Sequence, residues 1–209
     1  MVLLMEKNFK NIIFDLGGVI LDLDVPRTLQ EFAQASGLSV EKVVQIFRTS
    51  GGFERYERGE FSDAEFRDFV RNAYGITVSD SDLDRCWNAM LGPIPSAKLE
   101  LLTSLKASYP TFLLSNTNTI HLDYVNSVIL PSQNTAALEN YFHRTYYSHL
   151  MGKRKPEPEI FLQVLEENNL VASETLFLDD NPDNIAGAAA VGLQTAFVNT
   201  PDFILEYFR

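Results

Sequence analysis

The fold of this chain is decided by the stretch NIIFDLGGV, which runs from Asn11 to Val19. Its apolar run has the length of a buried strand, and it ends in an acid that is followed by two glycines. In open α/β sheets, ligands bind beside the carboxyl ends of the strands. The stretch therefore predicts a strand over Asn11 to Leu16 and makes Asp15 the first candidate for a reactive group.

Composition limits the class of protein. The chain has 209 residues, of which 45% are apolar, so it can bury a core as one domain with an insertion. Its 28 acidic and 17 basic residues give a formal charge of -11, which would repel a nucleic-acid backbone. The single cysteine, Cys86, rules out an internal disulfide, and no segment has the length of a membrane span. Because Met1 to Lys7 also lack the apolar stretch of a signal peptide, we expect a cytoplasmic protein, and its oligomeric state stays open.

Four apolar runs are predicted to form one parallel sheet, because helical patterns separate them. These runs are Asn11 to Leu16, Thr111 to Leu114, Thr175 to Leu178 and Gln194 to Val198. Far more residues separate the first two runs than a single crossover helix requires, which indicates an insertion. We expect residues 1–22 and 93–209 to form a core domain and residues 23–92 to form a helical domain.

Helix-start signals support this insertion. Ser39 and Ser79 stand where N-caps are expected, and the sequence SDAE from Ser62 to Glu65 is a capping box. Apolar residues follow at helical spacing, and Pro93 and Pro95 mark the return to the core. The insertion is therefore predicted to be a small helical bundle.

Three later segments carry polar groups at strand ends or in loops. FLLSNT, from Phe112 to Thr117, ends a strand in groups that can hold an anion. GKRKPEP, from Gly152 to Pro158, is a basic loop in which Pro156 suits the first turn of the next helix. LFLDDNPDN, from Leu176 to Asn184, ends a strand in two carboxylates, with Asp183 as the expected N-cap of the helix that follows. Acids and a lysine delivered in this way suit a magnesium-assisted phosphoryl transfer.

Four motifs, in the order in which they occur along the chain, resemble those of the haloacid dehalogenase superfamily of aspartyl-phosphate-forming phosphatases. They are FDLGGVILD from Phe14 to Asp22, LSN from Leu114 to Asn116, KP at Lys155, and LDD from Leu178 to Asp180 with Asn184. The stretch from Gly51 to Ser62 is most similar to bacterial sugar-phosphate phosphatases of the α-D-glucose-1-phosphate phosphatase kind. The resemblance implies an α/β fold with a Rossmann-like parallel-sheet core and an inserted helical cap of the C1 type.

The resemblance also implies the catalytic and substrate-binding residues. Asp15 would be the nucleophile that forms an aspartyl-phosphate. Ser115 and the N–H of Asn116 would bind the transferring oxygens. Lys155 would offset the negative charge of these oxygens and of Asp15, so it is both a catalytic and a substrate-binding residue.

The cofactor implied by the resemblance is Mg²⁺. The metal ligands would be the carboxylates of Asp15 and Asp180 and the backbone carbonyl of Gly17. Asp179 and Asn184 would lie beside them.

One position departs from the family pattern. Many of these phosphatases carry a second Asp two residues after the nucleophile, which protonates the leaving group, whereas this chain has Gly17. A positioned acid typically contributes a factor of about 10² to 10⁴. We hypothesise that the glycine goes with activated leaving groups, such as the anomeric oxygen of a sugar 1-phosphate. Asp22, Asp24 and Glu57 are the candidates for a substitute acid.

These observations predict a magnesium-dependent phosphoric monoester hydrolase that acts on a small phosphorylated metabolite, a sugar phosphate such as an aldose 1-phosphate. The segment from Gly51 to Glu60 is expected to face the core, where Arg55, Tyr56 and Glu57 would touch the sugar. Two alternatives stay open: a pseudo-phosphatase that binds a phosphorylated ligand without turnover, and a metal-independent haloacid dehalogenase. The clustered acids near Asp15 argue against the second, because they call for a cation.

Overall fold

The computed structural model describes residues 8–135 and 137–209, so the expectation drawn from Met1 to Lys7 lies outside the described residues. Its sheet is parallel, with the order β3-β2-β1-β4-β5. The strands are β1 (Asn11–Phe14), β2 (Thr111–Ser115), β3 (Arg144–Tyr147), β4 (Thr175–Asp179) and β5 (Gln194–Phe197). This confirms the predicted α/β class. Because β2 and β4 flank β1, the carboxyl ends of these strands meet at one edge of the sheet.

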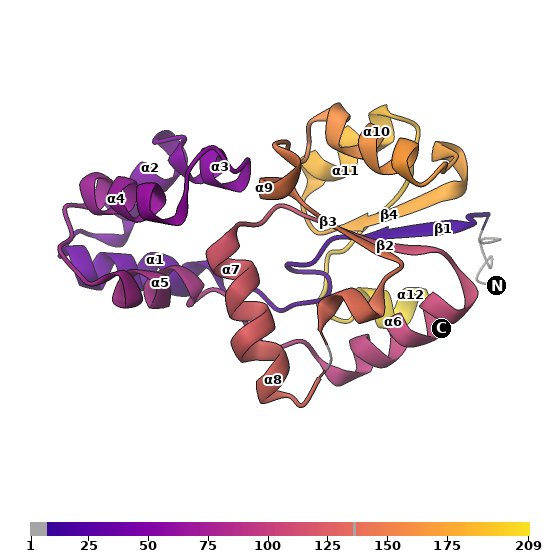
Figure 1. The fold of residues 1–209 in the computed structure, drawn as a ribbon, viewed down its shortest axis with the longest axis horizontal. Coiled ribbons are helices and arrows are strands. Elements are labelled where there is room, and N and C mark those ends of the chain that lie inside the picture. The colour runs from indigo at the N-terminus through magenta and orange to yellow at the C-terminus, as the bar shows by residue number, and fades with distance from the viewer. Residues whose placement is uncertain (1–7, 136) are drawn as a thin grey trace.

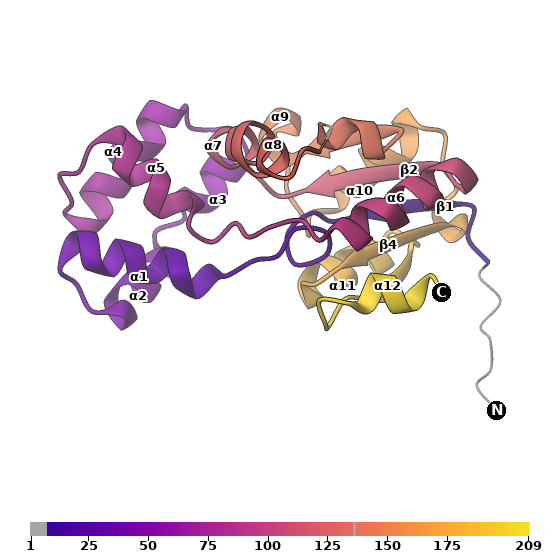
Figure 2. The same ribbon diagram turned by 90° about the horizontal axis from the view of Figure 1, so that it is seen from below.

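Helices cover both faces of the sheet (Figures 1 and 2). α6 (Ser96–Ser108) and α12 (Phe203–Tyr207) pack on one face, and α10 (Pro158–Glu167) and α11 (Pro182–Ala190) pack on the other. Side chains of β1 alternate between the two layers, as the period of a strand requires: Phe14 lies with α6 and Ile13 with α10. The remaining helical segments of this part are α7 (Thr119–Tyr124), η1 (Val125–Ile129), α8 (Leu130–Ser132), η2 (Leu138–Tyr141), α9 (Ser148–Met151) and η3 (Ala172–Glu174).

The helical insert, α1 to α5, has an aromatic core of its own, apart from the sheet (Figure 1). Rings of Phe53, Phe66 and Trp87 pack together at its centre. Ser39 and Ser79 cap helices, and the capping box at Ser62 is formed, so the predicted helix starts are confirmed. The helices are α1 (Val25–Ser36), α2 (Val40–Thr49), α3 (Gly52–Glu57), α4 (Asp63–Tyr74) and α5 (Asp80–Asn88).

The two chain segments that join the insert to the core run side by side. Leu23 and Leu91 form an antiparallel bridge, and the N–H of Gly92 donates to the carbonyl of Asp22 at 2.8 Å. The ammonium of Lys98, which is buried, lies 3.4 Å from the Asp22 carboxylate. The insert is therefore attached through a paired connection rather than through two independent linkers.

The structure differs from the sequence analysis at two points of the fold. Strand β3 was not predicted, because it lies at the sheet edge and begins with the exposed Arg144 rather than with an apolar run. The first turn of α10 holds Pro158 and not Pro156, which precedes the helix.

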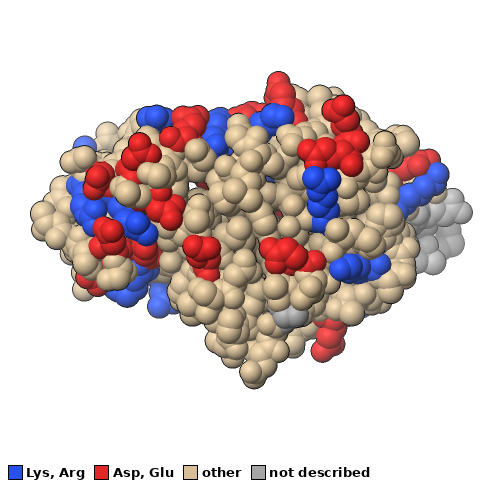
Figure 3. Space-filling model, in the orientation of Figure 1, with Lys and Arg blue, Asp and Glu red and all other residues tan. Residues whose placement is uncertain are grey.

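Two further features concern the length of the helices and the distribution of charge on the surface. No helix among the described residues is long and apolar enough to cross a membrane. On the face in Figure 3, basic side chains of the described residues lie among acidic ones.

Candidate active site

The ends of three neighbouring strands bring polar side chains together. Asp15 directly follows β1, and its N–H donates to the carbonyl of Leu178 in β4 at 2.9 Å. Ser115 and Asp179 are the last residues of β2 and β4. All three side chains are buried, although Asp15 still lines a pocket of about 610 Å³. The sheet order therefore places the predicted nucleophile in the wall of a cavity.

Lys155 enters this site from the loop between α9 and α10. Its ammonium donates to Asp15 Oδ1 at 2.6 Å, to Asp179 Oδ2 at 2.7 Å and to the carbonyl of Leu114 at 2.9 Å. The side chain is only 1% exposed, so the charge is buried and fully paired. An ammonium in this position can neutralise charge on Asp15 or on a group bound to it.

Asn116 holds the main chain of Lys155. Its side-chain amide donates to the carbonyl of Lys155 at 2.9 Å and accepts from the N–H of Lys155 at 2.9 Å. The side-chain amide of Asn116, one of the polar groups at the end of this strand, is therefore occupied by the loop. Asn116 fixes the base of the lysine side chain, a function that the motif did not reveal.

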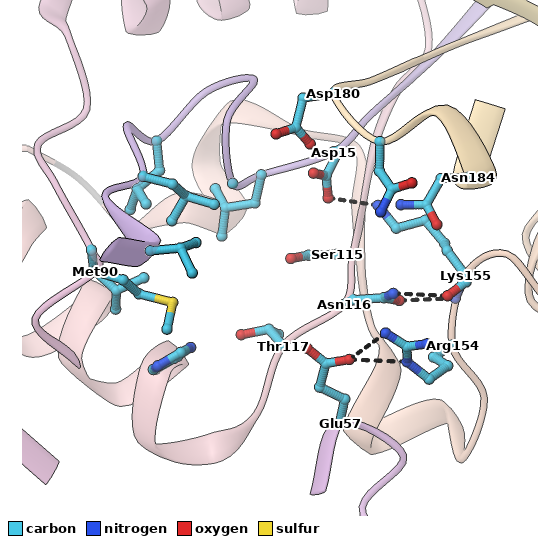
Figure 4. A pocket seen from close by; sticks show the side chains of 18 of the residues that line it. Asp15, Glu57, Met90, Ser115, Asn116, Thr117, Arg154, Lys155, Asp180 and Asn184 are labelled. Carbon is cyan, nitrogen blue, oxygen red and sulfur yellow. Dashed lines mark hydrogen bonds and ion pairs between the residues drawn. The ribbon is translucent and has the colours of Figure 1, made fainter. Parts of the chain in front are cut away.

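Asp180 lies beside Asp15, at the end of the pocket opposite to Glu57 (Figure 4). Carboxylate oxygens of Asp15, Asp179 and Asp180 lie within 4.8 Å of one another. Asp179 is taken up by Lys155 and by the amide of Asn184 at 3.0 Å, whereas no side chain of the described residues donates to the Asp180 carboxylate. Oxygen donors of this kind fit Mg²⁺, and Asp15 and Asp180 are the two with room for it.

Gly18 makes room for Asp180. It has a φ of +74°, and a Cβ built on it would overlap the Asp180 carboxylate. A glycine is therefore needed both for the backbone conformation and for the close approach of the acid.

The raised pKa values of the acids reflect burial first and the repulsion between neighbouring carboxylates second. Burial raises the pKa of Asp15 to about 7, Lys155 opposes this shift, and Asp179 adds to it. Burial and the charge of Asp179 also raise the pKa of Asp180. Burial works to lower the pKa of Lys155, but Asp15 and Asp179 outweigh it and raise this pKa. A cation beside Asp15 and Asp180 would relieve the repulsion.

The pocket wall beyond Gly17 is apolar. A Cβ at Gly17 would lie 2.7 Å from Leu23 Cδ1, so a linker side chain fills the space beside the position of the missing acid. Other apolar side chains that line the pocket are Leu21, Val25, Phe47, Met90 and Leu91.

Of the three insert residues expected to touch a ligand, only Glu57 lines the pocket. Arg55 pairs with Glu60 at 2.9 Å on the exposed surface, and the hydroxyl of Tyr56 donates to Asp63 at 2.7 Å within the insert. Neither Arg55 nor Tyr56 therefore lines the pocket as expected, because their side chains are engaged elsewhere.

Glu57 is joined to the core by Arg154, a pocket residue that the motifs did not single out. Arg154 Nε and one terminal nitrogen reach Glu57 Oε2 at 2.9 and 2.8 Å. The next residue of the insert, Arg58, pairs with Glu157 of the core. Two ion pairs thus connect the end of α3 to the loop that carries Lys155. The sequence signal for this contact was the position of Arg154, directly before Lys155 of the KP motif.

The remaining acids have other positions. Asp22 pairs with Lys98, and Asp24 caps α1 by accepting from the N–H of Arg27. Asp183 is not the N-cap of α11, as was expected: Asn181 accepts the N–H of Asp183 at 2.8 Å and occupies that position. Of the three candidates for a substitute acid, only Glu57 lines the active-site pocket.

Comparisons with known proteins agree with this geometry. The chain matches the family model described as haloacid dehalogenase-like hydrolase over residues 9–192. It is 31% identical to D-ribitol-5-phosphate phosphatase of Bacteroides thetaiotaomicron, over 89% of this chain and 90% of that protein. A haloacid dehalogenase family enzyme of the same organism, solved with magnesium and inorganic phosphate, is 38% identical with a TM-score of 0.85 and covers 96% of this chain and 100% of its own. L-2-haloacid dehalogenase of Xanthobacter autotrophicus shares the fold, with 19% identity, a TM-score of 0.61 and coverage of 90% and 77%.

Proposed function

Because the chain belongs to the haloacid dehalogenase-like hydrolase family, we propose that it is a Mg²⁺-dependent phosphatase of a small sugar or polyol phosphate. The observation that carries the proposal is the position of the Lys155 ammonium between Asp15 and Asp179, with the carboxylate of Asp180 left without a side-chain donor among the described residues. The buried ammonium of Lys155 and the three carboxylates form a site suited to bind a metal cation together with a phosphate group.

Asp15 is the proposed nucleophile. One of its oxygens attacks phosphorus, the bond from phosphorus to the leaving oxygen breaks, and an aspartyl-phosphate forms. Water then attacks the phosphorus and releases inorganic phosphate and the Asp15 carboxylate. Each displacement is in line, so the leaving group departs on the side opposite to the attacking oxygen.

The other proposed roles follow from the contacts. Lys155, fixed by Asn116, offsets charge on the phosphoryl oxygens, and the Ser115 hydroxyl and the N–H of Asn116 donate to them. Asp15, Asp180 and the carbonyl of Gly17 would hold Mg²⁺, which supplies charge neutralisation at the phosphoryl group. Asp179 keeps the lysine in place, and Asn184 keeps Asp179 in place.

Two observations support the proposed substrate class: the similarity to a named phosphatase and the glycine at position 17. The relative named for D-ribitol-5-phosphate supports a phosphorylated sugar or polyol. The apolar surroundings of Gly17 support a leaving group that departs with little help, such as the anomeric oxygen of an aldose 1-phosphate.

The test is a turnover assay on a panel of phosphate esters with and without EDTA. We expect hydrolysis of p-nitrophenyl phosphate, D-glucose 1-phosphate and D-ribitol 5-phosphate, lost on chelation and restored by Mg²⁺, with D-ribitol 5-phosphate the slowest because its leaving group is poor. Hydrolysis of D-glucose 6-phosphate faster than of the 1-phosphate would refute the explanation offered for Gly17.

The same assay separates the alternatives. Binding of phosphorylated ligands without any turnover would favour the pseudo-phosphatase. Release of halide from a 2-haloacid that survives EDTA would favour the dehalogenase. Neither has an observation in its favour that the phosphatase proposal does not also explain.

A further inference from the structure

The in-line displacement fixes where the leaving group lies in the pocket. Asp15 must stand on one side of the phosphorus atom and the departing oxygen on the other. Figure 4 shows Asp15 and Asp180 at one end of the pocket and Glu57 at the opposite end, with Ser115 between them. The leaving group therefore extends from the phosphate toward Glu57 and Arg154.

Glu57 presents a free acceptor to this part of the pocket. Nε and one terminal nitrogen of Arg154 bind Glu57 Oε2. Glu57 Oε1 receives no hydrogen bond from any residue that the structure describes. The carboxylate is held in place by a partner on the core, so it is a fixed acceptor rather than a mobile one. A partly buried carboxylate oxygen of this kind favours a ligand that supplies a donor.

The pocket also has an apolar surface, in contrast to the charged pair of Glu57 and Arg154. Apolar side chains, among them Leu23 and Met90, line the same pocket. A carbon chain that carries hydroxyl groups suits both surfaces, because its C–H groups can pack on the apolar side chains and a hydroxyl can donate to Oε1.

We propose that Glu57, held by Arg154, is a specificity-determining residue whose Oε1 accepts a hydrogen bond from a hydroxyl of the leaving group. The inference rests on the proposed phosphatase function and narrows its substrate class to esters with a free hydroxyl on the leaving group. Glu57 thereby discriminates against simple alkyl and aryl phosphates of similar size.

The experiment compares wild type and Glu57→Gln on three probes. Ribitol 5-phosphate has hydroxyls and a poor leaving group, propyl phosphate has no hydroxyl and a poor leaving group, and p-nitrophenyl phosphate has no hydroxyl and a good one. The control is Glu60→Gln, which loses the same charge three residues away in an exposed pair with Arg55. Thermal midpoints of all variants check that they are folded.

We expect Glu57→Gln to lower kcat/KM for ribitol 5-phosphate by roughly 10-fold or more, because a charge-assisted hydrogen bond is lost. The values for propyl and p-nitrophenyl phosphate should stay within about threefold of wild type, as should all three values for Glu60→Gln.

Each other outcome overturns the inference in a distinct way. Loss on ribitol 5-phosphate and propyl phosphate together would make Glu57 the substitute general acid. Equal loss on all three probes would mean that Glu57 only docks the insert, and no loss on any would leave it without a role. Wild type that hydrolyses none of the probes would instead refute the proposed function itself.

Discussion

The ammonium of Lys155 lies 2.6 Å from Asp15 Oδ1, although 140 residues separate the two in the sequence. It also lies 2.7 Å from Asp179 Oδ2, so one buried positive charge is shared by two carboxylates. With Asp180 nearby, the cluster keeps an excess of negative charge.

Replacing Lys155 should damage both activity and stability. Lys155→Met leaves Asp15 and Asp179 without their shared partner, and removal of one member of a buried ion pair costs about 3–5 kcal/mol. We expect a lower urea midpoint and a kcat reduced by roughly 10³-fold or more for p-nitrophenyl phosphate. Lys153→Met is the matched control, since the Lys153 ammonium lies in the same region and donates to the Gln163 side chain at 2.7 Å. Equal effects of the two changes would contradict the account.

Gly18→Ala should weaken metal binding. Its Cβ would overlap the Asp180 carboxylate and move it from the position proposed for a ligand. We expect the Mg²⁺ concentration for half-maximal activity to rise by roughly tenfold or more.

Gly37→Ala provides the control for that change. Gly37 has a φ of +70°, close to the +74° of Gly18, but a Cβ there meets nothing within 4 Å. Both variants carry the same backbone strain of about 1 kcal/mol. If the two had the same Mg²⁺ requirement, Gly18 would not be making room for a metal ligand.

The acid that this chain lacks can be added. Gly17→Asp alone brings its Cβ against Leu23, so we expect Gly17→Asp/Leu23→Ala to accept the new carboxyl better. A general acid helps poor leaving groups most, so kcat for propyl phosphate should rise by about tenfold relative to p-nitrophenyl phosphate. A ratio that stays the same in the double variant would show that space beside Gly17 does not limit acid catalysis.

Stability should fall with acid because of His121. Burial lowers its pKa from 6.5 to about 4, and its Nε2 faces the Trp87 carbonyl at 3.2 Å. The unfolded chain binds a proton near pH 6.5 and the folded one only near pH 4, so stability is lost as the pH falls through this window, by roughly 3 kcal/mol in full. His121→Gln keeps a donor for the carbonyl, and urea midpoints from pH 7 to 4 should then decline less steeply than in wild type. Parallel profiles would contradict this.

The fold could be predicted where local pattern and burial agree. The apolar runs of β1, β2 and β4 are buried on both faces, and Ser39, Ser62 and Ser79 cap helices as their side chains allow. Strand β3 escaped prediction because an edge strand needs no continuous apolar run, and Arg144 at its start is exposed.

The contacts of the site depend on packing that no local pattern encodes. The motifs indicated Asp15, Asp180 and Lys155, but the pairing of Asn116 with the Lys155 main chain comes from two loops distant in sequence. Likewise, three consecutive residues of α3 were candidates, and only the docking of the insert on Arg154 selects Glu57. The phase of a short helix relative to another domain is a tertiary property.

The most direct test of the central claim is the chemical identity of the intermediate. Wild-type protein is mixed with p-nitrophenyl phosphate and Mg²⁺, quenched in acid within milliseconds, digested and examined by mass spectrometry, with Asp15→Asn as the comparison and Asp24→Asn as the control. We expect a phosphoryl group on the Asp15 carboxylate that appears and decays in wild type and in Asp24→Asn, and neither this adduct nor turnover in Asp15→Asn. Turnover by Asp15→Asn at the wild-type rate, or a phosphoryl group on another residue, would contradict the account.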